Sequence, residues 1–208
     1  MSQSVNDLRV TRSQRFIREA LIDLIEERGF DALSVGEITA RAMVSRATFY
    51  RHYRDKYDLV EQIYAEAMQA LFGAIAVQET VHSPQIWVTF FDHVAEYDRL
   101  YGALLGEKGS PWFVRKMRTS LINLIKEFGR AAPQWQSDSA HPISLYPAED
   151  DLIPDVIATM FVEAITWWLE HGRPYPPQEM ARRCILLTGA IFKETSTWQA
   201  GNVVRDND

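Results

Sequence analysis

The sequence predicts an all-α protein of about nine helices, in which a three-helix helix-turn-helix domain (residues 1–56) precedes a larger helical domain (residues 57–208). Apolar residues recur at intervals of three and four along most of the chain, which is the spacing of one face of an α-helix. No alternation of apolar and polar residues is long enough to predict a strand, and no internal repeat or low-complexity tract interrupts the pattern. Glycine, proline and capping residues separate the periodic segments and set the expected helix ends.

The first predicted helix opens at Thr11, where Gln14 stands in capping-box position, and it ends at Gly29. Its apolar face consists of Ile17, Leu21, Leu24 and Ile25. Residues 1–10 are expected to form a mobile solvated arm. The alternative is that Arg9 or Arg12 reaches DNA phosphates or the minor groove.

Two short helices follow. Ser34 and Glu37 have the S-x-x-E spacing of a capping box, which begins a helix that runs to about Ala42. Residues 43–44 form a turn, and Ser45 caps a second helix that runs to about Tyr53. Two short helices joined by a tight turn are a helix-turn-helix, whose second helix lies in the major groove of DNA.

The side chains of this second helix suit DNA recognition. Arg46 can donate two hydrogen bonds to a guanine edge, and Ala47 can contact a thymine methyl group. Hydroxyl and imidazole groups nearby can reach phosphates, and a lysine in the first turn of the next helix is unfavourable unless an anion lies close to it. The candidate DNA-binding residues are Ser34, Ser45, Arg46, Ala47, Thr48, Tyr50, Arg51, His52 and Lys56. The alternative is an ordinary amphipathic helix pair with a solvated basic face.

Charge is distributed unevenly along the chain. The net charge is −6, which taken alone argues against a nucleic-acid binder. Residues 1–60, however, carry ten Lys and Arg against nine Asp and Glu, whereas residues 61–208 carry twelve against nineteen. Residues 41–56 contain five basic side chains and one acidic side chain. DNA binding requires a local positive patch and not a basic whole protein.

The remaining helices are read from the same periodicity. A long helix from Lys56 to Ile75 links the helix-turn-helix to the rest, and Ser110 is expected to cap a helix that begins at Pro111. Residues 131–151 are the least regular stretch, and so form a functional or mobile loop. Two apolar helices, from about Pro154 to Gly172 and from about Pro177 to Trp198, close the chain.

Residues 33–59, LSVGEITARAMVSRATFYRHYRDKYDL, resemble the DNA-binding signature of the tetracycline-repressor-like (TetR/AcrR) family of bacterial transcriptional regulators, and the match extends over about Thr11–Leu59. The resemblance implies a homodimer that binds a palindromic double-stranded DNA operator in the bacterial cytosol, associated with the nucleoid. It also implies a C-terminal helical domain for ligand binding and dimerisation. Met43 departs from the pattern, because the family commonly has glycine in this turn. Since methionine disfavours a left-handed backbone, we expect a slightly different turn.

Aromatic and apolar side chains of four C-terminal helices predict a site for an apolar or aromatic small-molecule effector. The candidate residues are Trp87, Phe90, Phe91, Val94, Tyr101, Trp112, Met117, Phe161 and Trp168. The alternative is that each of them is an ordinary core residue.

The last two predicted helices have more apolar positions than one buried stripe requires, which favours a subunit interface. The family resemblance implies that these two helices pair across a two-fold axis. The candidate interface residues are Val156, Met160, Trp167, Ile185, Gly189 and Phe192. The alternative is that both helices are buried within one subunit.

No enzyme motif, cofactor fingerprint or metal-ligand spacing is found in the sequence. We therefore expect no enzymatic activity and no cofactor. Without a long uncharged apolar run or an apolar leader, we also expect a cytoplasmic protein with no membrane partner. Cys184, the single cysteine, is expected to be a small core hydrophobe.

The leading functional hypothesis is a repressor that leaves its operator when a small ligand binds the C-terminal domain. A second hypothesis is a ligand-independent regulator or activator whose C-terminal domain only dimerises or binds a partner protein. The third is a helical enzyme or scaffold whose N-terminal helices bind another protein.

Overall fold

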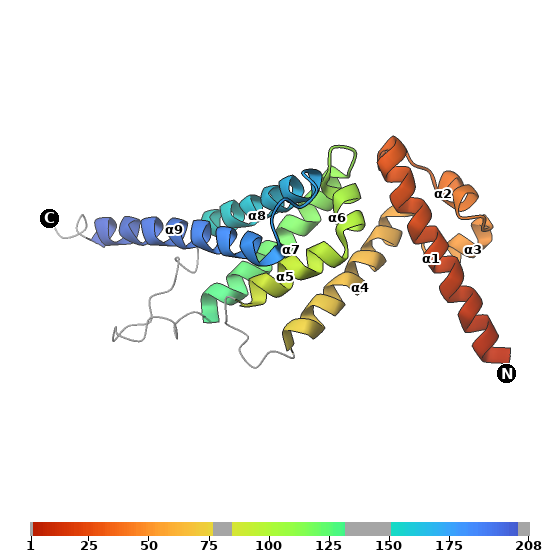
Figure 1. Cartoon of the computed structure of the whole chain (residues 1–208), viewed down its shortest axis with the longest axis horizontal. Coiled ribbons are helices and arrows are strands. Elements are labelled where there is room, and N and C mark those ends of the chain that lie inside the picture. Colours follow the sequence, from red (N-terminus) through yellow and green to blue (C-terminus); the bar gives the residue numbers. More distant parts are fainter. Residues whose placement is uncertain (1, 77–84, 132–150, 204–208) are drawn as a thin grey trace. The chain divides into compact units, whose positions relative to one another are not determined.

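The computed structural model describes residues 2–76, 85–131 and 151–203, and it is built of helices throughout these ranges (Figure 1). The described residues form nine helices and no strand, which confirms the predicted class. The helices are α1 (Ser2–Arg28), α2 (Val35–Arg41), α3 (Arg46–Tyr50), α4 (Lys56–Ala76), α5 (Gln85–Glu96), α6 (Asp98–Leu105), α7 (Pro111–Ala131), α8 (Leu152–Glu170) and α9 (Pro177–Val203). The irregular stretch expected at residues 131–151 lies almost wholly outside the described residues.

The chain packs into two compact units. Unit 1 comprises Met1–Ala74 and Tyr97–Phe113, and unit 2 comprises Ile75–Glu96 and Val114–Asp208. Helix α6 therefore packs with the N-terminal helices, although helices of unit 2 flank it in the sequence. These two units are defined by which helices pack together. The predicted boundary after residue 56 instead separates a DNA-binding domain from a ligand-binding domain, and it stays a prediction.

Unit 1 is organised around α1. Ile17, Leu21 and Ile25 are fully buried on one face of this helix, as the periodicity predicts. Phe49 of α3 is also fully buried and so fixes this short helix to the core. Aromatic pairs extend the unit toward the start of α7: Tyr57 lies edge-on to Trp112 at 5.3 Å between ring centroids, and Tyr64 lies edge-on to Phe113 at the same separation.

Two expectations about helix starts were wrong. Helix α1 begins at Ser2 and not at Thr11. No glycine or proline interrupts Ser2–Arg28, and once a helix has nucleated it propagates at low cost through such a sequence. Ser110 precedes α7 as expected, but its Oγ is buried without a hydrogen-bond partner, so the expected cap is not made.

The core of unit 2 is aromatic. Trp87 and Phe91 of α5 meet Phe161 of α8 at ring-centroid distances of 4.5 and 6.3 Å, and Phe91 also lies edge-on to Trp168 at 5.7 Å. Helix α8 is long and apolar enough to cross a membrane by length and composition alone. However, eight of its residues are buried within the protein, which is typical of a core helix.

Two titratable side chains, Cys184 and His93, are buried in unit 2. Burial raises the pKa of the Cys184 thiol to about 11, so the thiol stays protonated at neutral pH. Its 2% exposure is consistent with the expected role of a small core hydrophobe. His93 of α5 is 6% exposed, and burial lowers its pKa from 6.5 to about 4. The imidazole is therefore neutral in the folded protein at pH 7.

We predict that His93 makes the protein sensitive to acid. Because the folded-state pKa is depressed, the unfolded chain binds a proton at higher pH than the folded chain, and stability is lost as the pH falls from 6.5 toward 4. Between pH 7 and 5 this loss amounts to about 2 kcal/mol. Urea unfolding of the His93→Gln variant should show a correspondingly smaller loss between these pH values. A loss in His93→Gln as large as that of the unsubstituted protein would contradict this role of His93.

Candidate nucleic-acid interface

Helix α2 begins with the predicted capping box. The Ser34 hydroxyl accepts a hydrogen bond from the Glu37 amide at 3.3 Å, and the Glu37 carboxylate accepts bonds from the Ser34 amide at 2.9 Å and hydroxyl at 2.8 Å. These bonds, together with nearby Arg28, hold the pKa of the Glu37 carboxyl below its ordinary value. Ser34 is exposed at this helix start, but its hydroxyl is already bonded to Glu37.

Helix α3 presents one face to the core and the other to solvent. The Ser45 hydroxyl caps the helix by accepting from the Thr48 amide at 3.0 Å, and the two hydroxyl groups lie 2.9 Å apart. With Phe49 buried, Arg46, Ala47 and Tyr50 are exposed. The helix ends at Tyr50, three residues before the predicted end, because residues 51–52 form a turn.

The turn between α2 and α3 contains a strained residue. Met43 has a φ of +54°, which is the left-handed conformation that side chains with a Cβ rarely adopt. The expectation that methionine would alter this turn was wrong, because the backbone keeps the conformation that suits glycine. Its side chain is 95% exposed, so it buries almost no surface in return for the strain.

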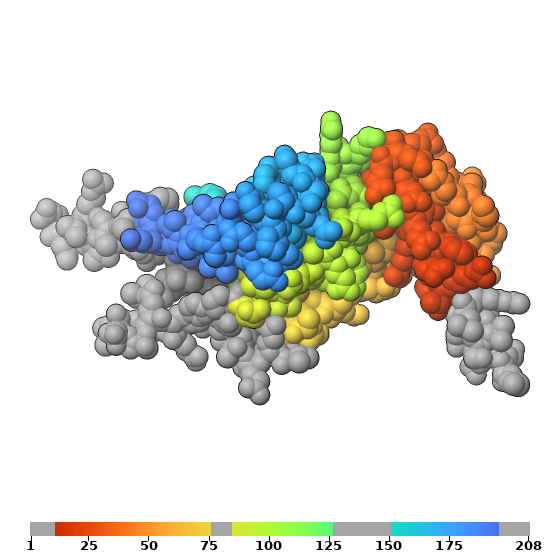
Figure 2. Space-filling view, in the orientation of Figure 1, coloured from red at the N-terminus to blue at the C-terminus, as the bar shows by residue number. Residues whose placement is uncertain are grey.

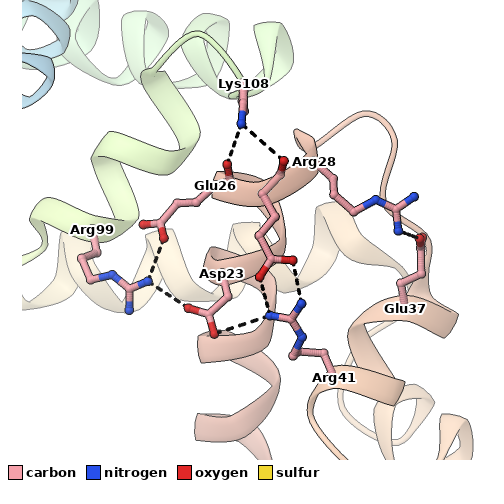
Figure 3. Close-up of polar contacts among 8 residues, drawn as sticks. Asp23, Glu26, Arg28, Glu37, Arg41, Arg99 and Lys108 are labelled. Carbon is pink, nitrogen blue, oxygen red and sulfur yellow. Dashed lines mark hydrogen bonds and ion pairs between the residues drawn. The ribbon is translucent and has the colours of Figure 1, made fainter.

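Most arginines of unit 1 are paired with carboxylates (Figure 3). Arg41 of α2 bonds Glu27 of α1 through both terminal nitrogens, at 2.8 and 2.6 Å. Arg99 of α6 bonds Asp23 at 2.9 Å and Glu26 at 3.0 Å, reaching the same end of α1 from the other side. Lys108 adds a different bond, since its ammonium donates to the backbone carbonyl of Glu26 at 2.9 Å.

Further pairs complete this pattern. Arg28 bonds Glu37, as Figure 3 also shows. Arg18 and Glu66 form two bonds of 2.5 Å, and Arg54 bonds Asp58 at 3.1 Å. These contacts join α1 to α2, α4 and α6, and they neutralise the arginines that take part in them.

The two arginines at the ends of α3 differ from the other arginines because neither is paired with another described residue. Within the described part of the chain, Arg46 and Arg51 have neither a carboxylate partner nor a hydrogen-bonded one, and both are exposed. Arg46 is the first residue of α3 and Arg51 is its C-cap. Of the five basic side chains in residues 41–56, three are therefore bonded to other groups of the protein. The two guanidinium groups that are not bonded to any described residue lie one at each end of α3.

Lys56 has partners that the sequence did not reveal. Its ammonium donates to the backbone carbonyls of Phe30, Asp31 and Leu33 at 2.8, 3.0 and 2.9 Å, which uses all three of its N–H bonds. It also lies 4.7 Å from the centroid of the Phe30 ring. A phosphate contact by Lys56 stays a prediction, but the structure gives this residue the task of tying the α1–α2 loop to α4.

His52 is only partly available for DNA. Its Nε2 is buried without a hydrogen-bond partner, and its backbone carbonyl accepts from the Gln62 amide group at 3.1 Å. A phosphate contact through Nε2 would require the ring to turn outward.

This arrangement of capped helices agrees with comparisons to known proteins. The model of the bacterial regulatory proteins of the tetR family matches residues 17–63, and a model of a transcriptional regulator C-terminal region matches residues 82–188. Together the two matches cover the helix-turn-helix and most of the remaining helices. The chain belongs to the TetR family of transcriptional regulators.

One relative and two solved structures illustrate the likeness of this TetR-family chain. The Bacillus subtilis protein YxbF, described as an uncharacterized HTH-type transcriptional regulator, is 20% identical over 179 residues, which are 85% of this chain and 44% of YxbF. The chain spans less than half the length of the curated relatives that it matches.

Among solved structures, the fatty acid degradation regulator FadR from Bacillus halodurans has a TM-score of 0.62 at 16% identity, over 85% of this chain and 94% of FadR. The dihydroxyacetone kinase operon activator DhaS has a TM-score of 0.56 at 18% identity, over 87% of this chain and 96% of DhaS. Likeness at these identities shows the shared fold.

The structure divides the residues expected to line an effector site. Trp87, Phe90, Phe91, Val94, Met117, Phe161 and Trp168 lie in unit 2, and five of them form a connected set of ring contacts. Tyr101 and Trp112 belong instead to unit 1, although all nine were expected in one domain. Sequence spacing could not reveal this, because α6 packs with helices that precede it by about 70 residues.

The TetR-family regulator also exposes apolar surface on its last two helices. Val156 and Trp167 of α8 are 44% and 43% exposed, and Met160 on the same face is half-buried. On α9, Ile185 and Phe192 are half-buried, and a Cβ at the exposed Gly189 would meet no atom within 4 Å. Figure 2 shows α9 along the surface of its unit, in blue.

Three further apolar residues of these two helices are exposed. Leu152 is 61% exposed, and Leu186 and Leu187 are 58% and 55% exposed. A spacing of four residues between Leu152 and Val156 was the signal that could have found the first. The two leucines of α9 belong to the surplus of apolar positions that predicted an interface on the last helix.

The strain at Met43 yields a prediction about stability. The Met43→Gly variant should be more stable by about 0.5–1 kcal/mol, because relief of the left-handed strain exceeds the extra chain entropy of glycine. Urea unfolding measures this difference. Gly172 provides the opposite control, because it has a φ of +67° and open space around its Cβ position. Gly172→Ala should destabilise the protein through backbone strain alone. An unchanged or lower stability of Met43→Gly would show that the turn is not strained.

Proposed function

We propose that this regulator binds its operator through Arg46 and Arg51, and that it does so as a repressor controlled by a small apolar or aromatic effector. The observation that supports the DNA-binding residues most strongly is charge pairing: the guanidinium groups of α3 are exposed and uncommitted, whereas the arginines around them are paired. An unpaired exposed guanidinium can bind a phosphate or a base edge without first breaking an internal ion pair.

The geometry of α3 assigns different tasks to its residues. Its N-terminal residues enter the major groove when a recognition helix docks, so Arg46 would bond a guanine edge and the exposed Ala47 would face bases. Arg51 at the C-cap and the hydroxyl groups of Thr48 and Tyr50 would contact phosphates, which fixes the register of the helix on the duplex. The buried Phe49 prevents α3 from rotating about its axis.

The Arg46→Ala variant should lose about 1–3 kcal/mol of operator binding and should relax the preference at one base pair. Binding is measured by fluorescence anisotropy on an operator selected from a pool of random duplexes and on its single-base variants. Arg54→Ala is the matched control, because it removes the same charge nearby from a residue that is paired with Asp58. An equal loss for every DNA sequence, or an equal loss in the control, would contradict the role given to Arg46.

Arg51→Ala should behave differently from Arg46→Ala. A phosphate contact carries no sequence information, so this variant should weaken binding to all sequences evenly and reduce the dependence of log K on log salt by about one unit.

Effector control would act through unit 2. An effector that binds one conformation better shifts the protein toward that conformation only by the difference between its two affinities. A repressor that releases its operator in this way acts in the cytoplasm, where DNA and small metabolites are both accessible. This proposal predicts that the effector, which raises the unfolding temperature by binding the folded protein, also lowers operator affinity because it binds the two conformations differently.

One observation favours the second candidate, a ligand-independent regulator or activator. The aromatic residues expected to line an effector site are largely buried against one another, and the Trp168 indole N–H already donates to the Tyr175 carbonyl at 2.8 Å. A set of rings packed in this way can serve as an ordinary core. For such a regulator, compounds that raise the unfolding temperature would leave operator affinity unchanged.

We also propose that the exposed apolar face of α8 and α9 joins two copies of the chain. Exposed leucine and tryptophan side chains gathered on two helices are unusual on a monomer surface. A two-fold dimer would place its two recognition helices about 34–36 Å apart, or at a multiple of that distance, to match successive turns of DNA.

Replacing both Leu186 and Leu187 with glutamate should produce a folded monomer, because these side chains lose little burial within the protomer. Sedimentation velocity should show the monomer, and operator affinity should fall with the loss of the second half-site. Gln69→Glu, at an exposed position of α4, controls for added negative charge. A double variant that stays dimeric at the same concentration would place the interface elsewhere.

A further inference from the structure

Gly36 lies directly beside the recognition arginine. It is the second residue of α2, and a Cβ built on it would lie 2.5 Å from Nη2 of Arg46, 3.3 Å from Cζ and 3.5 Å from Nε. Three atoms of one guanidinium group therefore occupy the volume that any other residue at this position would need. The Arg46 head group rests against the bare backbone of the first turn of α2.

The other helical glycines of unit 1 do not have this relation. A Cβ at Gly73 of α4 or at Gly102 of α6 would meet no atom within 4 Å. These two positions are glycine without any evident need for space, whereas the space at Gly36 is filled by a side chain of another helix.

The surroundings of Arg46 explain why shape matters here. The nearest carboxylate in sequence to Gly36 is Glu37, which is bonded to Ser34 and to Arg28. Arg46 has neither an ion pair nor a hydrogen bond within the described residues, so contact with the α2 backbone is what restricts its head group. An arginine side chain has several rotatable bonds, and a surface that removes some of its conformations lowers the entropy cost of placing it on one base.

We propose that Gly36 is a specificity-determining position: its missing side chain forms a shelf that holds the Arg46 guanidinium at the angle from which it reads one base pair. This inference rests on the proposed role of Arg46 in base recognition. Gly36 is a positioning residue in this scheme, because it acts on DNA only through Arg46.

Glycine at this position is costly to the helix, which separates the proposal from a purely structural explanation. Within a helix, alanine is favoured over glycine because glycine loses more conformational freedom on folding. The added methyl group would meet only the far end of a flexible side chain, which can move away. Gly36→Ala should therefore fold at least as well as the unsubstituted protein and yet recognise DNA less well.

The test uses the full chain with Gly36→Ala, Arg46→Ala and the double variant, and with Gly73→Ala as the matched glycine control. The unsubstituted protein first selects an operator from duplexes with a randomised centre of about 20 base pairs, which covers two half-sites. Anisotropy titrations then use this operator and its variants at the base pair where Arg46→Ala relaxes the preference. Thermal unfolding reports folding, and Gly36→Ser, which adds the same Cβ, repeats the test if Gly36→Ala does not fold.

We expect Gly36→Ala to keep or raise the unfolding temperature, to weaken operator binding about 10-fold, and to lose preference at the same base pair as Arg46→Ala. Gly73→Ala should bind like the unsubstituted protein. In the Arg46→Ala background, Gly36→Ala should cause no further loss, since the two residues act as one unit.

Two results would overturn the inference: unsubstituted affinity and preference in Gly36→Ala, or a Gly36→Ala loss that adds fully to that of Arg46→Ala. If Arg46→Ala relaxes no base pair, the proposed function of Arg46 fails together with the shelf. If Arg46→Ala relaxes one base pair while Gly36→Ala binds normally, only the shelf fails.

Discussion

Unit 1 depends on the pairing of its arginines with carboxylates at the C-terminal end of α1. Acidic side chains at a helix C-terminus repel the partial negative charge of the free carbonyls there, so Asp23, Glu26 and Glu27 would weaken α1 if they were alone. Arg41 and Arg99 offset that charge from α2 and α6, and Lys108 bonds a free carbonyl directly. A single exposed ion pair contributes little to the free energy of unfolding. Here, however, the contacts join α2, α6 and the loop after α6 to one turn of α1.

The same pairing determines where positive charge remains. Carboxylates of α1 and α4 bind Arg41 and Arg54, and backbone carbonyls bind Lys56, so these basic groups already have partners within the protein. Positive charge is thereby concentrated on Arg46 and Arg51, the two ends of α3. Internal pairing and DNA recognition are two consequences of one distribution of carboxylates, which is why an acidic chain can present a basic helix.

The helix-turn-helix also contains two positions where local stability and the required geometry disagree. Met43 adopts a backbone conformation that suits glycine, and Gly36 occupies a helix position that would favour almost any other residue. The first of these residues lies in the turn between α2 and α3, where its backbone is left-handed. The second leaves room for a guanidinium group. Such local disagreements are expected where function and not folding selects the residue.

The sequence by itself determined the helical class and both caps of the helix-turn-helix, because these depend on interactions between residues three or four apart. It also predicted that α3 is the recognition helix and that the two last helices are candidates for an interface. Tertiary structure alone decided which arginines are uncommitted, that Lys56 binds the α1–α2 loop, that α6 packs with α1, and that Gly36 adjoins Arg46. The reason is physical: each of these facts depends on contacts between separate helices or loops, and no periodic spacing along one helix encodes which distant group will lie against it.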